Sequence, residues 1–169
     1  MTYEFLNVEQ DGHVTTITLN RPDVMNAISV PMHFELQRAF DAFAADDEQW
    51  ICVVTGAGER AFCAGSDLKD AMARQSEGEV LGKYPPNGYA GLTERYDLAK
   101  PIVAAVNGLA LGGGFEIVLA CDLVIATENA AFGLPEPRVG AIALGGGLHR
   151  LVRQIGQRAA MGMILTGRQ

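Results

Sequence analysis

Residues 100–126 read KPIVAAVNGLALGGGFEIVLACDLVIA, and this stretch decides the fold class. The apolar run at 102–106 is short and continuous, which is typical of a strand buried on both faces. The glycines at 112–114 interrupt the chain, and the apolar residues at 115–120 then predict a helix. A second apolar run at 123–126 predicts another buried strand. Strand, helix and strand in this order predict parallel strands in an α/β domain.

The chain before this stretch carries the same alternation. Residues 5–8 and 13–19 predict a hairpin because Asp11-Gly12 is a turn signal between them. Apolar residues recur at helical spacing over 31–45, and 51–55 predicts a further strand buried on both faces. The sequence further predicts a loop at 56–68, a short helix at 67–74 and a mobile Gly/Pro-rich segment at 76–91. It also predicts a short strand at 131–133 and helices at 148–155 and 158–165.

Composition predicts one soluble globular domain over residues 1–169, with 49% hydrophobic and 20% charged residues. The net charge of −7 argues against a nucleic-acid partner, because phosphate binding needs a basic surface. The start MTYEFLNVEQDG lacks the pattern of a signal peptide, and no apolar run reaches the roughly 18 residues of a membrane span. Cys52, Cys63 and Cys121 show no metal-ligand spacing and predict buried free thiols. We therefore expect a cytoplasmic protein with no metal and no membrane partner.

Residues 56–61 fit the pattern G-x-G-x-x-G/A and follow a predicted strand, which is a weak signal for dinucleotide binding. That site requires a helix that opens directly at the glycines. Residues 61–65 do not have such a helical pattern, so the dinucleotide hypothesis is disfavoured.

Glycines mark the ends of two predicted strands, within residues 62–69 and 107–116. Backbone N–H groups there can approach a ligand without an intervening side chain. Two such groups aimed at one carbonyl oxygen would form an oxyanion hole, and the helix that begins near Gly113 would favour negative charge on that oxygen. The alternative is that the three glycines only form a tight turn.

Two carboxylates stand in apolar surroundings. Glu116 follows the glycines in the first helical turn, and Glu136 lies between Pro135 and Pro137. Neighbouring carboxyl groups in apolar surroundings acquire raised and separated pKa values, which suits one as an acid and the other as a base. The alternatives are a helix-dipole partner for Glu116 and a solvated loop charge for Glu136.

Six motifs occur in order along the chain, at residues 20–27, 55–58, 62–69, 100–108, 112–116 and 132–136. Together they resemble the crotonase (enoyl-CoA hydratase/isomerase) superfamily. The resemblance implies a ββα spiral with two roughly perpendicular sheets flanked by helices. Residues 90–94, with 113–116, are also similar to the crotonobetainyl-CoA (carnitine-pathway) hydratase branch.

The resemblance further implies which residues act. The N–H groups of Ser66 and Gly113 would hold the thioester carbonyl, and Glu116 and Glu136 would bind the water that hydratases add in the syn sense. Isomerases and hydrolases of the superfamily often keep only one of these acids, so hydration is favoured over both.

The resemblance also implies that the substrate is an acyl-CoA, with no tightly bound cofactor. Coenzyme A would meet the backbone at Asn26, Ala27 and Ala64, and Lys69 and Arg21 would face its phosphates; either side chain could instead be a solvated surface charge.

Members of the family usually continue beyond the position of Gln169 into helices that build trimers and hexamers, so we expect this sequence to be either a fragment or a shortened member. With that region we expect a homo-oligomer. The alternative without it is a non-catalytic subunit that binds CoA or takes part in assembly.

Overall fold

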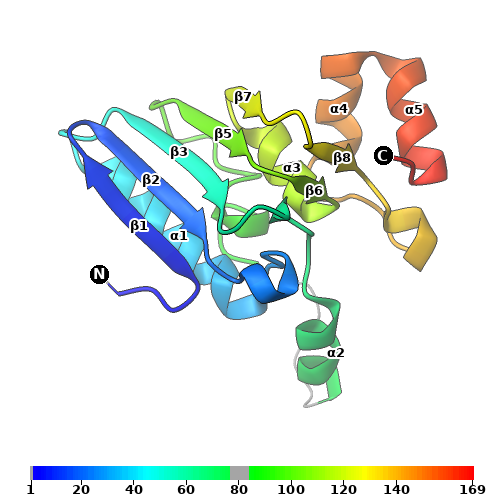
Figure 1. Ribbon diagram of the computed structural model, residues 1–169, viewed down its shortest axis with the longest axis horizontal. Coiled ribbons are helices and arrows are strands. Elements are labelled where there is room, and N and C mark those ends of the chain that lie inside the picture. Colours follow the sequence, from blue (N-terminus) through cyan, green and yellow to red (C-terminus); the bar gives the residue numbers. More distant parts are fainter. Residues whose placement is uncertain (1, 77–83) are drawn as a thin grey trace.

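The computed structural model describes residues 2–76 and 84–169. Its larger sheet has the strand order β1-β2-β3-β5-β7, in which β1 and β2 are antiparallel and the other neighbours are parallel (Figure 1). These strands are β1 (Leu6–Asp11), β2 (Val14–Leu19), β3 (Ile51–Gly56), β5 (Ile102–Val106) and β7 (Leu123–Ala126). The hairpin and the parallel strands predicted from the sequence are confirmed.

A second, parallel sheet has the order β4-β6-β8 and consists of three-residue strands. They are β4 (Ala61–Cys63), β6 (Leu109–Leu111) and β8 (Ala131–Gly133). The prediction of an uninterrupted loop over 56–68 is wrong, because β4 lies inside it. A three-residue strand is too short to show an alternating pattern of its own. The two-sheet α/β architecture is as predicted.

In Figure 1 one long helix, α1 (Val30–Ala45), lies behind the larger sheet, whereas α2 (Leu68–Ser76) projects away from both sheets. Helix α1 begins with Pro31 in its first turn, where a missing N–H costs no helical hydrogen bond. Helices α4 and α5 pair at the end of the molecule that also carries β8 (Figure 1). The α-helices are α1 (Val30–Ala45), α2 (Leu68–Ser76), α3 (Gly113–Ala120), α4 (Gly147–Ile155) and α5 (Gln157–Thr166), and the 3₁₀ helices are η1 (Pro22–Val24), η2 (Tyr89–Gly91) and η3 (Glu136–Val139). No helix in the described ranges has the length and apolar character needed to cross a membrane.

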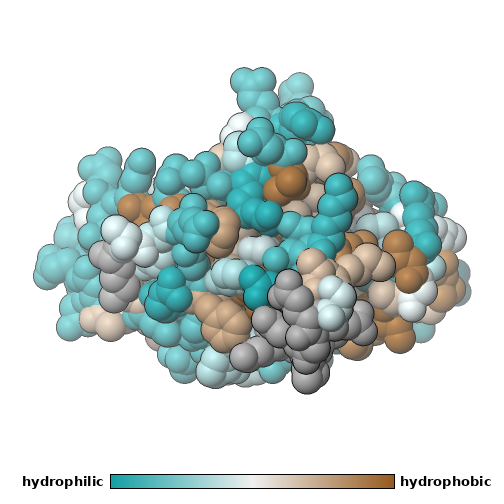
Figure 2. All heavy atoms as spheres, turned by 90° about the horizontal axis from the view of Figure 1, so that it is seen from below, coloured by the Kyte–Doolittle hydropathy of each residue, from teal (hydrophilic) through white to brown (hydrophobic). Residues whose placement is uncertain are grey.

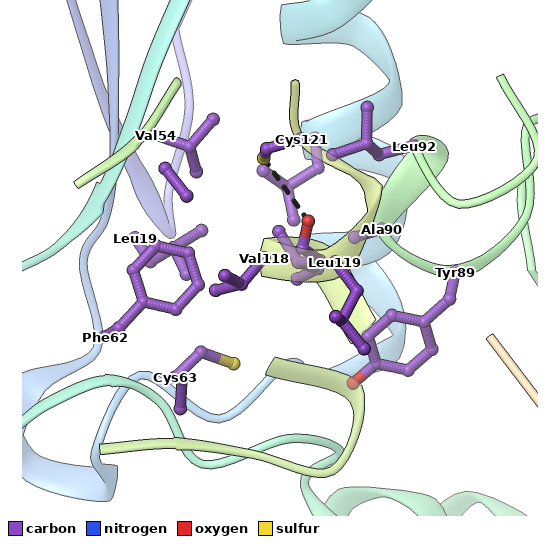
Figure 3. Packing of buried hydrophobic residues seen from close by; sticks show 14 of the residues in the cluster. Leu19, Val54, Phe62, Cys63, Tyr89, Ala90, Leu92, Val118, Leu119 and Cys121 are labelled. Atoms are coloured by element: carbon purple, nitrogen blue, oxygen red, sulfur yellow. Dashed lines mark hydrogen bonds between the residues drawn. The ribbon is translucent and has the colours of Figure 1, made fainter. Parts of the chain in front are cut away.

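The core joins both sheets to α1 and α3. Leu19, Val54 and Phe62 approach Val118 and Leu119 of α3 in Figure 3, and all five side chains are buried. The three cysteines are free and buried within the same core, as predicted. Burial raises the pKa of the Cys52 and Cys63 thiols to about 12, so both are neutral and unreactive at ordinary pH.

Two expectations about burial need correction. Strand β7 was predicted to be buried, but Leu123 is 61% exposed and Ile125 68% exposed, because β7 is the outermost strand of its sheet. Strand β3 begins with the exposed Ile51, and β3 and β5 otherwise alternate between buried and half-buried residues, so neither strand is buried on both faces. The mobile segment predicted at 76–91 includes residues 77–83, which lie outside the described part of the chain, whereas its end at Tyr89–Gly91 is buried.

Candidate active site

A cavity of about 550 Å³ opens where the ends of β4 and β6 meet the start of α3. Both glycine-marked strand ends and both carboxylates predicted from the sequence lie on its wall. The lining consists of Ala64, Gly65, Ser66, Leu68, Tyr84, Tyr89, Glu94, Gly112, Gly113, Glu116, Pro135, Glu136, Arg138, Val139, Ala141, Ile142, Leu144 and Gly145. The apolar side chains Val139, Ile142 and Leu144 are exposed, and hydrophobic side chains gather at this end of the molecule in Figure 2.

The two glycine-marked strand ends approach each other closely. Gly65 has φ +93°, and a β-carbon there would lie 2.9 Å from the Leu111 carbonyl oxygen and 3.2 Å from the Gly113 nitrogen. Gly113 is the first residue of α3, so its N–H has no acceptor within the helix. Across the described ranges, neither the Ser66 N–H nor the Gly113 N–H donates to a protein oxygen. Two unused amide donors are therefore available beside the cavity.

The carboxyl of Glu116 is held in place by the backbone that follows η3. Glu116 is only 4% exposed, and its Oε1 accepts a hydrogen bond of 2.8 Å from the Gly147 N–H. Glu136 Oε1 lies beside the backbone of Gly112, where a β-carbon would be 3.0 Å away. Glu136 Oε2 is buried without a hydrogen-bond partner among the described residues. An unsatisfied buried carboxyl oxygen that lines a cavity is suited to bind a polar ligand there.

Burial dominates the ionisation of both carboxyls. Burial is the main reason why the pKa of Glu116 is raised to about 7. The negative charge of Glu136 also raises this pKa, whereas the hydrogen bond from the Gly147 N–H lowers it. Burial also raises the pKa of Glu136. Two acids whose pKa values lie closer to neutrality can exchange protons with a bound substrate at ordinary pH.

The raised pKa of Glu116 predicts a pH-dependent stability. The folded chain keeps a proton on Glu116 that the unfolded chain releases between pH 4.5 and about 7. The free energy of unfolding therefore falls as pH rises through this window. Glu116→Gln removes the ionisation and keeps an oxygen for the Gly147 N–H. We expect the variant to gain about 1–3 kcal/mol over the wild type at pH 8 and little at pH 4.5. Urea unfolding at both pH values measures this, and equal gains at both would contradict it.

The residues predicted to contact coenzyme A are not all at the cavity. Ala64 lines it, whereas Asn26, Ala27, Arg21 and Lys69 do not. The Arg21 guanidinium forms a 2.9 Å ion pair with Asp67 and donates a 2.6 Å hydrogen bond to the Ala27 carbonyl. Lys69 is exposed on α2. Arg21 therefore has structural partners, and Lys69 is the freer cation.

Asn26 has a structural role that the sequence did not reveal. It is buried with φ +55°, and its side-chain amide donates to the carbonyls of Ala57 and Ala61. Its Oδ1 accepts the Arg21 N–H at 3.0 Å. The side chain thereby ties the segment before β4 to the segment after β2.

Asn26→Ala is expected to lower the free energy of unfolding by about 2–4 kcal/mol, because it leaves these buried partners unpaired and strains the backbone. Asn129→Ala, on an exposed residue, is the matched control. Urea unfolding of both variants measures the difference. Unchanged stability of Asn26→Ala together with weakened CoA binding would instead make Asn26 a ligand contact.

Several cavity residues were missed from the sequence. Tyr84 and Tyr89 lie within the segment predicted to be mobile, and Gly145 contacts the Glu116 carboxyl together with Gly147, which does not line the cavity. A β-carbon on Gly145 would come within 2.7 Å of Glu116 Oε2. The glycine run at 145–147 was therefore the sequence signal for a close approach of this backbone to the site.

Comparisons with known proteins agree with the motif order. The family model for enoyl-CoA hydratase/isomerase matches residues 9–169. A carnitinyl-CoA dehydratase of Salmonella paratyphi B is 43% identical over 167 residues, which cover 98% of this chain and 62% of that protein. The chain thus spans about 62% of the length of this curated relative.

Solved structures show the same relationship. A carnitinyl-CoA hydratase from Mycobacterium avium superposes with a TM-score of 0.89 at 44% identity, covering 99% of this chain and 63% of that one. An enoyl-CoA hydratase from Mycobacterium tuberculosis H37Rv gives a TM-score of 0.86 at 39% identity, covering 97% and 62%. Sequence and fold therefore agree over nearly the whole chain, which belongs to the enoyl-CoA hydratase/isomerase family of the crotonase superfamily.

Proposed function

We propose that this chain carries the active site of a lyase that adds water to, or removes it from, the α,β double bond of an acyl-CoA thioester. One observation carries the proposal: two unused backbone N–H groups and two carboxyls with raised pKa values line a single cavity. Negative charge forms on the thioester oxygen during this reaction, and protons move at the adjacent carbons. The cavity offers groups for both needs.

The proposed reaction gives each of these groups one task. The thioester oxygen accepts hydrogen bonds from the Ser66 and Gly113 N–H groups, which stabilise the enolate. The reactive form has one proton between the two carboxyls, held by Glu136, so that ionised Glu116 takes a proton from water while the water oxygen bonds to the β-carbon. Neutral Glu136 then gives its proton to the α-carbon, and the double bond is lost. Acting from the same side of the bound substrate, the two acids would add hydrogen and hydroxyl to one face, which is syn addition.

The CoA moiety would leave the cavity past Ala64, which lies on its wall. The backbone at Asn26 and Ala27 is proposed to contact the adenine and pantetheine. Lys69, exposed on α2, is the proposed phosphate contact. Arg21 could bind phosphate only by leaving Asp67 and the Ala27 carbonyl.

A quaternary-ammonium acyl group is a second candidate for the substrate head group. Glu94 and Tyr84, which is 49% exposed, lie on the cavity wall along with Glu116 and Glu136. Aromatic faces and carboxylates are the groups that bind such cations. The named carnitinyl-CoA relatives agree with this choice. Turnover of crotonobetainyl-CoA and crotonyl-CoA, measured side by side, tests it.

The central test mixes the purified chain with crotonyl-CoA and follows the loss of enoyl-thioester absorbance. Product mass then separates the outcomes. Gain of one water supports the hydratase. Release of free CoA would indicate a hydrolase, and migration of the double bond in a longer enoyl-CoA would indicate an isomerase. A folded chain that binds CoA without turnover would support a non-catalytic subunit.

A further inference from the structure

We propose that Tyr89 is a positioning residue that fixes the positions of the two amide donors of the oxyanion hole relative to each other. Its ring packs on Gly113 and its hydroxyl contacts Ser66, so one side chain touches both donor residues. This inference rests on the proposed function, because it assigns a task within that reaction.

The contact with Gly113 is direct. Tyr89 is 6% exposed, and a β-carbon added to Gly113 would collide with the ring carbons and the hydroxyl of Tyr89. The ring therefore rests against the backbone of a cavity-lining residue that supplies one of the two proposed donors. A smaller side chain at position 89 would leave this backbone without support on that side.

Tyr89 also contacts Ser66, the residue that supplies the other proposed donor of the oxyanion hole. The Tyr89 hydroxyl lies 3.1 Å from Ser66 Oγ. Burial raises the pKa of Tyr89 well above its usual value, so the hydroxyl remains neutral. Ser66 follows β4 and Gly113 begins α3, so the tyrosine bridges two elements that are separate in the sequence.

Tyr89 is itself fixed by its neighbours in the chain. Ala90 adopts φ +56°, which is unfavourable for a residue other than glycine, and its N–H donates to His33 Nδ1 at 2.9 Å. The His33 ring stands edge-on to the Tyr89 ring, with centroids 4.5 Å apart. Gly91 packs so closely on α1 that a β-carbon would lie 2.6 Å from Gln37 Cα. A strained, tightly anchored segment that places one side chain is typical of a functional site.

The test uses Tyr89→Phe, which removes the hydroxyl and keeps the ring, and Tyr89→Leu, which removes the ring. For Tyr89→Phe we expect kcat to fall about 2–10-fold, the value of one hydrogen bond, with little change in KM. For Tyr89→Leu we expect a loss approaching the 10²-fold typical of one missing donor. Tyr96→Phe, on a residue that is 82% exposed, makes the same chemical change away from the cavity and should match the wild type.

A spectroscopic probe separates positioning from general packing. The absorption of 4-dimethylaminocinnamoyl-CoA moves to longer wavelength as its carbonyl is polarised. We expect a smaller shift in Tyr89→Phe and Ser66→Ala than in the wild type. The double variant should resemble either single variant, because both substitutions remove the same contact.

The outcomes are distinguishable. If the wild type neither binds nor shifts the probe, the proposed function fails. If the wild type shifts the probe and Tyr89→Phe, Tyr89→Leu and Ser66→Ala all shift it equally, Tyr89 only fills space and the inference is overturned. Ser66→Ala changes an exposed side chain and keeps the backbone amide donor, so we expect this variant to fold normally. Its probe shift therefore tests the contact between Ser66 and Tyr89 even if a Tyr89 variant loses stability.

Discussion

Glu116→Gln is expected to lower kcat for hydration of crotonyl-CoA by about 10²–10⁴-fold, the usual contribution of a general acid or base. Glutamine retains an oxygen for the Gly147 N–H, so the side chain keeps its position. It cannot take a proton from water, and the attack on the β-carbon then lacks its base. KM should change far less, because the thioester is held by backbone donors. Steady-state absorbance kinetics across substrate concentrations separates the two constants.

Glu136→Gln should cause a loss of the same order, since the α-carbon then lacks its proton donor. The double variant should lose little more than the worse single variant, because the two acids serve one reaction. Glu128→Gln, on an exposed residue, is the control and should retain wild-type kcat. Wild-type rates in both single variants would remove these carboxyls from the mechanism, even if the chain proved to be a hydratase.

The fold was predictable wherever a pattern extends over several residues. Helix α1 and strand β5 followed from their apolar spacing, and both were confirmed. Strands β4 and β6 escaped prediction because each has only three residues and lies between glycines that indicate turns, whereas the equally short β8 was predicted. The exposure of β7 was also hidden, since an apolar run does not reveal whether a strand is central or outermost.

The site was predictable only in part. Glu116 and Glu136 could be selected because glycines or prolines flank them. The partners that tune them come from distant segments: Gly147 is 31 residues from Glu116 in the sequence. Likewise, Arg21 could be read as a phosphate ligand because its partner Asp67 is 46 residues away. Motifs identify reactive groups, whereas pairings between distant segments require coordinates.

The glycine run at the start of α3 provides the second large effect. Gly114→Ala is expected to lower the free energy of unfolding by at least about 2 kcal/mol, because the new β-carbon would overlap the carbonyl of Cys63. That carbonyl belongs to β4 and cannot rotate away as a side chain could. The overlap must push α3 and the end of β4 apart, and these two elements carry the Gly113 and Ser66 donors. Urea unfolding measures the first effect.

The same displacement predicts a loss of activity beyond the loss of stability. In Gly114→Ala that remains folded, kcat should fall by about 10²–10³-fold, as when one oxyanion donor is lost. Gly162→Ala is the matched control, because its β-carbon in α5 meets only the flexible end of Arg168. There the expected change is neutral or a gain of about 0.5–1 kcal/mol, since alanine favours a helix over glycine. A Gly114→Ala variant as stable and as active as Gly162→Ala would show that the spacing between β4 and α3 does not set the oxyanion hole.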